Sequence, residues 1–377
     1  MAEELTAELR DLLALTLVPG LGPRLTAALL ARFGSASAAV NASEYDLSQV
    51  THIGSKLARS FSEALRSISV EAEIERIARF GIHLTALNTV DYPQALATIS
   101  DPPHLLYVRG ELLPADSKAI AIVGSRQCTP YGKRVTEKLA GDMARAGFTI
   151  VSGLARGIDG AAHRGAIDAG GRTIAVLAGG LSSIYPPEHA DLAAEVAEHG
   201  ALIAETPMAM QPQRGMFHAR NRLISGLARA VVIIEANERS GALITARHAA
   251  EQGREVFAIP ANVDSVTSAG NLRLLRQGVR LIRHADDLLE DLQGISVPES
   301  IPVATGEPAR QAPAAPSKPM GLEPIPSSIW DFLDEPKHVD AITRAVGLPI
   351  AELSRMLTTM ELKKIVRRLP GNHYERR

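Results

Sequence analysis

The sequence of 377 residues lacks or has little of several features that define particular protein classes. It holds a single cysteine, so no internal disulfide can form and a disulfide-stabilised scaffold is excluded. A lone cysteine also excludes a CxxC metal site and fits a reducing compartment, so we expect a cytoplasmic protein. No apolar run approaches the roughly 18–20 residues of a membrane-spanning helix, so no membrane span is expected. The acidic, mixed N-terminus is unlike a signal peptide.

Net charge and aromatic residues are also scarce. The formal net charge is −2 and aromatic residues make up 4% of the chain, which is typical of a soluble enzyme and gives no indication of nucleic acid. The total is, however, a sum of opposite local charges. Residues 124–172 and 214–254 each carry +4, whereas residues 173–213 carry −5. A basic groove attracts a polyanion even when the whole protein is neutral.

Familiar nucleotide and metal motifs are missing as well. The chain contains no GxxxxGK[ST] sequence, which argues against a P-loop ATPase. It contains no HExxH and no clustered histidine and carboxylate set, which argues against a metal nuclease. We therefore expect neither a cofactor nor a metal ion.

Composition divides the chain into parts. Residues 293–326 include eight prolines and show no helical or strand period, which is typical of an extended linker. At roughly 100–200 residues per domain, the length predicts two or three domains. We expect a helical domain at 1–68, a core at 69–292 and a C-terminal domain at 327–377.

The N-terminal part predicts short helices joined by tight turns at 18–23 and 52–56. An apolar residue and a glycine between two helices form the helix-hairpin-helix pattern, whose backbone N–H groups can point at a phosphate. Residues 1–68 hold six Lys and Arg against seven Asp and Glu, and a DNA-binding surface is usually more basic. A helix-packing role is favoured, and phosphate binding stays open.

Short apolar runs alternate with segments of helical period from about residue 119 to 292. Unbroken runs are typical of strands buried on both faces, and the alternation predicts a parallel sheet covered by helices on both sides. Such sheets bind ligands at the carboxyl ends of their strands. The expected strands are 119–124, 148–153, 173–180, 201–207, 230–236 and 255–261, and the expected helices are 130–146, 158–169, 187–199, 217–229 and 241–252.

A track of phosphate contacts is predicted where small, hydroxyl-bearing and basic residues follow these strands. Glycine lets a ligand approach the backbone, serine donates a hydrogen bond, and the arginine fork suits a phosphate. One mononucleotide needs one or two such turns, whereas four indicate several phosphates. The turns supply Gly124, Ser125 and Arg126, then Ser152, Gly153 and Arg156, then Arg220, Asn221 and Arg222, and finally Ser240 and Gly241.

Other roles are open for residues near the second and third turns. Asp159 can cap the following helix, and His163 can act as a base in a hydrolase-like trio with Ser152 and Asp159. No GxSxG elbow frames the serine, which argues against the trio. Tyr185, on the loop after the third strand, either stacks on a nucleic-acid base or packs its own loop.

The last fifty residues predict two helices and a hairpin. The helices fall at 338–346 and 350–360, and the strands at 363–369 and 373–375. This order is typical of a winged helix. Residues 361–377 carry a net charge of +4, which favours nucleic-acid contact by the wing, while protein contact stays open.

Five sequence patterns occur together and in order: GSR, SGLARGIDxxAH, GLxxxYP, FxxRNRxISGL and SGALxTA. Together they resemble the DNA-processing protein A (DprA/Smf) family of bacteria, over about residues 90–292. The resemblance implies an α/β fold with an extended Rossmann-like core, an N-terminal all-α SAM-like or helix-hairpin-helix domain and a C-terminal winged helix. It implies sequence-independent binding and protection of single-stranded DNA in natural transformation, loading of the recombinase RecA, a homodimer and no nucleotide hydrolysis.

The resemblance also implies roles for single residues. Arg126 would contact a phosphate, the loop with Ser152, Gly153 and Arg156 would border the same groove, and Tyr185 would stack on a base. His189 stands where the family has asparagine, and Ser182 and Ser183 stand where some members have basic residues. Arginines at 214–222 could replace those cations. The dimer surface would fall near 243–290.

Two other functions stay open at this point. Phosphoribohydrolases of the same superfamily cleave a nucleoside monophosphate at a PGGxGT turn beside a glutamate. Here the equivalent turn, 240–245, lacks those glycines, and the nearest carboxylate on the helix is Glu251. A transcriptional reader would use the winged helix, but its second helix offers only Arg355 as a base-reading cation.

Overall fold

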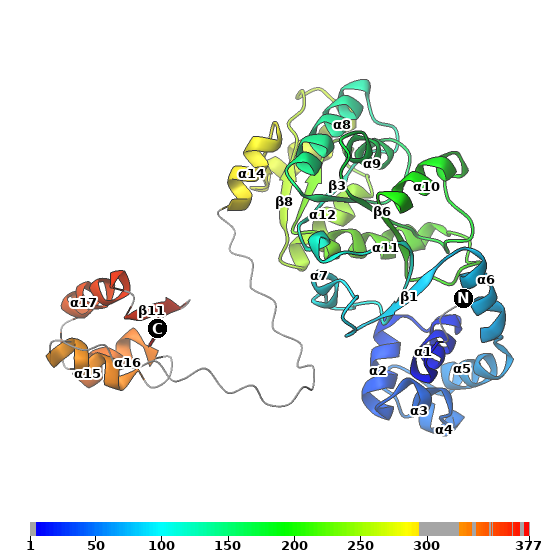
Figure 1. Ribbon diagram of the computed structural model, residues 1–377, viewed down its shortest axis with the longest axis horizontal. Helices are drawn as coiled ribbons and strands as arrows, with labels where there is room; N and C mark the ends of the chain where they lie inside the picture. Colours follow the sequence, from blue (N-terminus) through cyan, green and yellow to red (C-terminus); the bar gives the residue numbers. More distant parts are fainter. Residues whose placement is uncertain are drawn as a thin grey trace. The chain divides into compact units, whose positions relative to one another are not determined.

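The computed structural model describes residues 5–293, 324–333, 337–346, 348, 350–363, 365–369 and 373–376. The chain forms two compact units, Met1–Val303 and Ala304–Arg377 (Figure 1). Most of the predicted linker lies outside the described residues. Within the described residues, no helix combines the length and apolar character that crossing a bilayer requires.

Six helices open the first unit, and two of their turns share one local structure. In the turns at 18–22 and 50–54 the third residue has a positive φ, 81° at Gly20 and 69° at His52. Gly22 and Gly54 then precede the next helix in extended conformation. Both predicted hairpins are therefore present. The helices are α1 (Ala7–Leu17), α2 (Pro23–Phe33), α3 (Ala36–Val40), α4 (Glu44–Ser48), α5 (Ser55–Ser67) and α6 (Val70–Arg79).

In the described part of the first unit, the sheet has nine strands in the order β1-β2-β6-β5-β4-β3-β7-β8-β9. The β1–β2 and β2–β6 pairs are antiparallel, and every pair from β6 to β9 is parallel. The six predicted strands are confirmed as β3 to β8, whereas β1, β2 and β9 were not predicted. The strands are β1 (His83–Ala86), β2 (Leu105–Gly110), β3 (Ala119–Val123), β4 (Thr149–Ser152), β5 (Thr173–Val176), β6 (Gly200–Ala204), β7 (Ala230–Ile233), β8 (Glu255–Ala258) and β9 (Arg280–Leu281).

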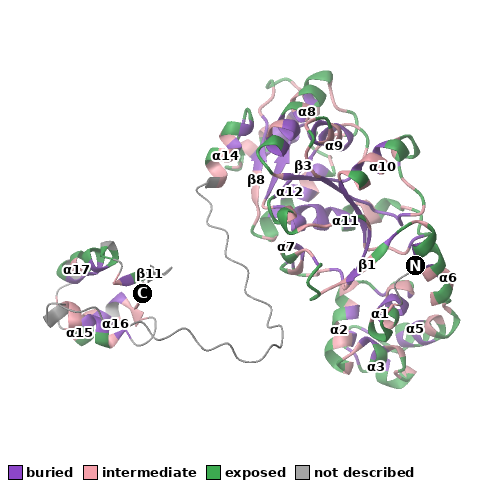
Figure 2. Cartoon of the chain, viewed as in Figure 1, coloured by how far each residue is buried: buried purple, intermediate pink, exposed green. Residues whose placement is uncertain are grey.

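Helices cover both faces of this sheet because alternate strand residues point to opposite sides. Ile120 and Ile122 pack under α8 and α9, whereas Ala121 and Val123 pack under α11 and α12. The five central strands β3 to β7 between these layers are buried throughout (Figure 2). One layer holds α8 (Pro130–Arg145), α9 (Ile158–Asp168), α10 (Ala190–Glu198) and α14 (Ala285–Gln293), and the other holds α7 (Gln94–Ala97), α11 (Arg214–Leu227), α12 (Ala242–Glu251) and α13 (Ala269–Arg276).

The order of the parallel strands reverses at β3. From β3 the chain continues to β4, β5 and β6 on one side, and later to β7, β8 and β9 on the other. The connections after β3 and β7 therefore lie on opposite faces of the sheet and leave a crevice at the carboxyl ends of these two strands.

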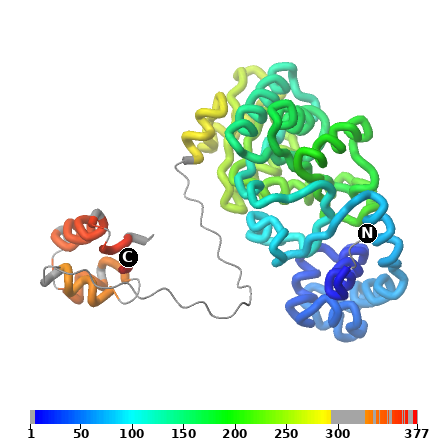
Figure 3. The backbone as a smooth tube through the Cα atoms, in the orientation of Figure 1, coloured from blue at the N-terminus to red at the C-terminus, as the bar shows by residue number. Residues whose placement is uncertain are grey.

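The N-terminal helices share a hydrophobic core with the antiparallel edge of the sheet. Leu13 of α1 and Ile77 of α6 belong to the same buried cluster as Tyr107 of β2 and Met208. The backbone of these helices accordingly runs beside β1 and β2 (Figure 3). The domain boundary expected at residue 68 remains a prediction.

The second unit has the helix, helix and hairpin order expected of a winged helix. Its core includes Ile342, Leu353 and Val366, and the three strands among its described residues are ordered β10-β12-β11. α15 begins at Pro324, within the segment predicted to be linker. The elements are α15 (Pro324–Phe332), β10 (Lys337–His338), α16 (Val339–Val346), α17 (Ile350–Leu362), β11 (Val366–Leu369) and β12 (His373–Arg376).

Candidate nucleic-acid interface

A groove of about 740 Å³ opens in the crevice between the carboxyl ends of β3 and β7. The turns after β3, β4 and β7 and one side of α11 line it. A small pocket lined by Tyr185 and Gly153 adjoins the groove and shares Arg126 and Phe217 with it. Ten of the twelve predicted residues line the groove or the pocket: Gly124, Ser125, Arg126, Gly153, Arg156, Tyr185, Arg220, Asn221, Ser240 and Gly241.

The turn after β3 is fixed to the end of β7. The Ser125 amide donates to the Glu235 carbonyl oxygen at 2.7 Å. A Cβ on Gly124 would stand 2.6 Å from Ile158 Cγ1 and 2.9 Å from the Glu235 carbonyl oxygen, so only glycine fits. The two turns therefore form one rigid edge of the groove.

The buried carboxylate of Glu235 is already engaged. It accepts hydrogen bonds from the Thr129 amide at 2.8 Å and from the Thr129 hydroxyl at 2.5 Å, at the start of α8. Glu251, by contrast, is exposed and faces His248 at 3.6 Å. Neither carboxylate is among the residues that line the groove.

An arginine and two aromatic rings gather where the groove meets the pocket. The Arg126 guanidinium lies 4.7 Å from the centroid of the Phe217 ring. The Tyr185 and Phe217 ring centroids are 5.7 Å apart, with their planes tilted by 58°. Tyr185 is 41% exposed, so its ring is accessible. Phe217 was not predicted as a site residue, although it is the first residue of the FxxRNR pattern.

The loop after β4 is held by the segment that follows Tyr185. Arg156 forms an ion pair with Glu188, and both side chains are about half exposed. The hydrogen bond and charge of Glu188 raise the pKa of Arg156. His189, in place of the family's asparagine, donates from Nδ1 to the Leu154 carbonyl oxygen at 2.9 Å.

Arg220 and Asn221 form the floor of the groove. The Arg220 guanidinium donates to the carbonyl oxygens of Gly153, at 2.7 Å, and Val176. Burial lowers the pKa of Arg220 to about 10, opposed by the nearby charge of Asp159. The Asn221 amide donates to the Gly241 carbonyl oxygen at 3.3 Å. These two side chains therefore connect the ends of β4 and β5 to the turn before α12.

Ser152 and Arg222 are the two predicted residues that the structure does not bring to the groove. The buried Ser152 hydroxyl donates to the Ile122 carbonyl oxygen at 2.6 Å. Arg222 forms ion pairs with Glu205 and, at 3.5 Å, with Asp101. The helical period explains this, since residues two apart on a helix point about 200° apart. With Arg220 facing the groove, Arg222 faces away.

The hydrolase-like trio is not assembled. His163 Nδ1 lies 2.7 Å from the Thr173 hydroxyl, and Ser152 is bonded to a backbone carbonyl. Asp159 is not the N-cap of α9, because that position is Gly157, whose φ of 74° suits glycine. The Asp159 carboxylate instead accepts from the Ala155 amide at 3.3 Å.

Several cations at the groove keep their charge available. Within the described part of the chain, Arg126, Arg214 and Arg239 line the groove without a carboxylate at ion-pair distance. The described residues also include no cluster of three or more side chains suited to a metal ion.

The sheet is mostly parallel, and a basic groove lined by glycine lies where its strand order reverses. Together with a winged helix in the same chain, these features are typical of Rossmann-like proteins that bind nucleic acids. The sequence model of the family described as DNA recombination-mediator protein A matches residues 83–293. The model described as DprA winged helix domain matches residues 311–372. The chain belongs to the DprA/Smf family of DNA-processing proteins.

Relatives are similar over most of the chain. Protein Smf of Synechocystis sp. is 34% identical and the match covers 97% of this chain and 98% of that one. The structure of DprA from Streptococcus pneumoniae is 32% identical, with a TM-score of 0.65 over 77% of this chain and 99% of that one. DprA from Helicobacter pylori, described for its single-stranded DNA binding mode, is 32% identical, with a TM-score of 0.51 over 56% of this chain and 96% of that one.

Proposed function

We propose that this protein binds and protects single-stranded DNA without sequence preference during natural transformation, as a binding protein rather than an enzyme. The observation that carries the proposal is the cluster of Arg126, Phe217 and Tyr185 at the groove. A guanidinium contacts any phosphate, and an aromatic ring stacks on any base. Bases in a duplex are already stacked, so this combination favours a single strand.

The phosphate track runs along the groove from this cluster. Arg214 and Arg239 supply charge without an ion-pair partner among the described residues, and Gly241 opens the backbone before α12. Arg156 joins them when a phosphate displaces Glu188. The single-stranded DNA binding described for the Helicobacter pylori relative supports the same ligand here.

The same proposal includes a cytoplasmic homodimer that loads RecA onto the bound strand. The family's description as a recombination mediator supports the RecA step. Within the predicted dimer segment at 243–290, Val263 and Val266 are 91% and 81% exposed, which suits an interface between copies. Sedimentation equilibrium and RecA filament assays on coated DNA would test these two parts.

A competition experiment tests the core of the proposal. Labelled single-stranded DNA is titrated with the protein at several salt concentrations, against unlabelled single strand, duplex and mononucleotide. We expect single strands of different sequence to compete equally, and mononucleotide to fail. Arg126→Ala should weaken binding to all sequences alike. It should also reduce the slope of log affinity against log salt concentration by about 0.7 in magnitude. Arg66→Ala, an exposed arginine of α5 outside the groove, is the matched control.

Two results would contradict the proposal. Unchanged affinity of the Arg126 variant would remove the groove from the binding site. Release of free base from a nucleotide by the pure protein would instead make it an enzyme.

A further inference from the structure

We propose that the N-terminal helices brace the Tyr185 loop, and that Glu73 of α6 is the positioning residue through which they do so. Nothing in this role requires the N-terminal helices to touch DNA. The inference rests on the proposed function, because it assumes that Tyr185 stacks on a base.

Glu73 holds the turn that follows β6. Glu73 is 2% exposed, and its Oε1 accepts a hydrogen bond from the Met208 amide at 2.6 Å. Oε2 lies 3.3 Å from the Arg76 guanidinium. Burying a carboxylate is costly unless hydrogen bonds and an opposite charge compensate it. This contact therefore fixes residues 207–210 to α6.

The same turn carries the loop that ends at Tyr185. The Met208 carbonyl oxygen accepts from the Ser182 amide at 3.2 Å and from the Ser182 hydroxyl at 2.6 Å. The Gly180 amide donates to the Met210 carbonyl oxygen at 2.8 Å. Ser182, which stands where some family members have a basic residue, is here committed to this backbone contact.

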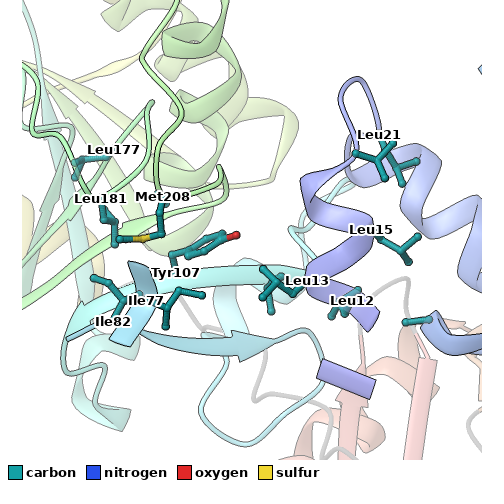
Figure 4. Packing of buried hydrophobic residues seen from close by; sticks show 14 of the residues in the cluster. Leu12, Leu13, Leu15, Leu21, Ile77, Ile82, Tyr107, Leu177, Leu181 and Met208 are labelled. Atoms are coloured by element: carbon teal, nitrogen blue, oxygen red, sulfur yellow. The ribbon is translucent and has the colours of Figure 1, made fainter. Parts of the chain in front are cut away.

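Apolar packing runs parallel to the hydrogen bonds. Leu177, Leu181 and Met208 lie on one side of the buried Tyr107 ring, and Leu13 of α1 lies on the other (Figure 4). Other residues of this loop, Gly179, Ser183 and Tyr185, line the pocket. This loop is therefore linked to the N-terminal helices through Tyr107 and the turn at 207–210, and it also lines the candidate stacking site.

Loss of the Glu73 contact would leave the Met208 amide without its acceptor and the loop less ordered. Tyr185 would then have to be ordered by the DNA itself, which reduces affinity without removing any phosphate contact. A variant that lacks the Glu73 contact should therefore lose base stacking, while the salt dependence of its DNA affinity stays unchanged.

The test uses the full-length protein and an oligonucleotide that contains 2-aminopurine, whose fluorescence reports stacking. Glu73→Leu removes the acceptor at similar size, Glu73→Gln keeps an acceptor oxygen, and Glu75→Gln changes an exposed carboxylate of the same helix. We expect Glu73→Leu to lose the stacking signal and about fivefold in affinity, at the low end of one base stack. Glu73→Gln should recover most of both, and Glu75→Gln should match wild type.

A double-mutant cycle separates positioning from general destabilisation. In a Tyr185→Ala background, Glu73→Leu should cost less than twofold, because the ring that it positions is gone. An equal fivefold loss in both backgrounds, or wild-type stacking in Glu73→Leu, would overturn the inference. If Glu73→Leu does not fold, Ser182→Ala loosens the same path from its other end, and unchanged stacking there would overturn it as well. Failure of the wild-type protein to bind single strands would instead reject the proposed function.

Discussion

Phe217 contacts Arg126 and Tyr185, the two side chains proposed to bind a phosphate and a base of the single strand. The Arg126 guanidinium lies 4.7 Å from the centroid of its ring, and the Tyr185 ring lies 5.7 Å away. An exposed cation–π contact contributes about 0.5–1 kcal/mol, and a tilted ring pair about 0.5–1.5 kcal/mol. Phe217→Leu removes both contacts and keeps an apolar side chain. The variant should therefore lose up to about 1–2.5 kcal/mol of binding free energy, which corresponds to a roughly five- to seventyfold weaker affinity for DNA.

Fluorescence anisotropy with labelled single-stranded DNA measures this loss over a series of salt concentrations. Because Phe217→Leu removes no charge, the slope of log affinity against log salt should stay at the wild-type value. Tyr131→Leu is the matched control, since Arg134 lies 5.9 Å from the Tyr131 ring outside the groove.

Wild-type affinity in the Phe217 variant would refute the reasoning, because Arg126 and Tyr185 would then need no common support. A change in salt slope would also refute it, since that result would mean that Phe217 acts on the number of phosphate contacts.

Three further predictions follow from single contacts. Glu188→Gln frees Arg156, so DNA affinity measured by anisotropy should rise about two- to fivefold at low salt and converge on wild type at high salt. Arg222→Ala removes the buried cation from Glu205, whose side chain is only 16% exposed, so urea denaturation should show a loss of about 3–5 kcal/mol in the free energy of unfolding, and a loss below 1 kcal/mol would contradict this. Burial lowers the pKa of His163 to about 3, so below pH 6.5 the unfolded chain takes up a proton that the folded protein does not. The free energy of unfolding should therefore fall as pH decreases, by about 2 kcal/mol from this histidine at pH 5, and His163→Asn should flatten that dependence.

The strands that sequence alone predicted are those with an unbroken apolar run, such as β3 and β7, because burial on both faces excludes polar residues. β9 has two residues, Arg280 and Leu281, both exposed, so no pattern marks it. The position of β7 beside β3 was also not predictable, since strand order depends on contacts between distant segments. The crevice depends on that strand order. The sequence therefore predicts the individual turns but not that the turns after β3 and β7 line the same groove.

The chemical type of a residue predicts less well than its place in the fold whether its side chain reaches the groove. Arg220, Arg222 and Ser152 fit the chemistry of phosphate binding, yet each donates to protein groups. Phe217 belongs to the same FxxRNR pattern, but an aromatic side chain beside several arginines gives no sequence signal for phosphate binding. The side of α11 on which each residue lies decides that Arg220 faces the groove and Arg222 faces away.

The local charge of +4 in residues 214–254 also overstates the field at the groove. Four of the seven arginines in this segment donate to protein oxygens: Arg220, Arg222, Arg229 and Arg254. The cations left for phosphates at the groove are Arg126, Arg214 and Arg239, with Arg156 available once Glu188 is displaced. Three or four contacts predict a salt slope of about −2 to −3 for a single strand. A slope of −5 or steeper would require cations outside this groove, either from a second copy of the chain or from the winged helix, and titration of a variant that ends at residue 303 would distinguish the two.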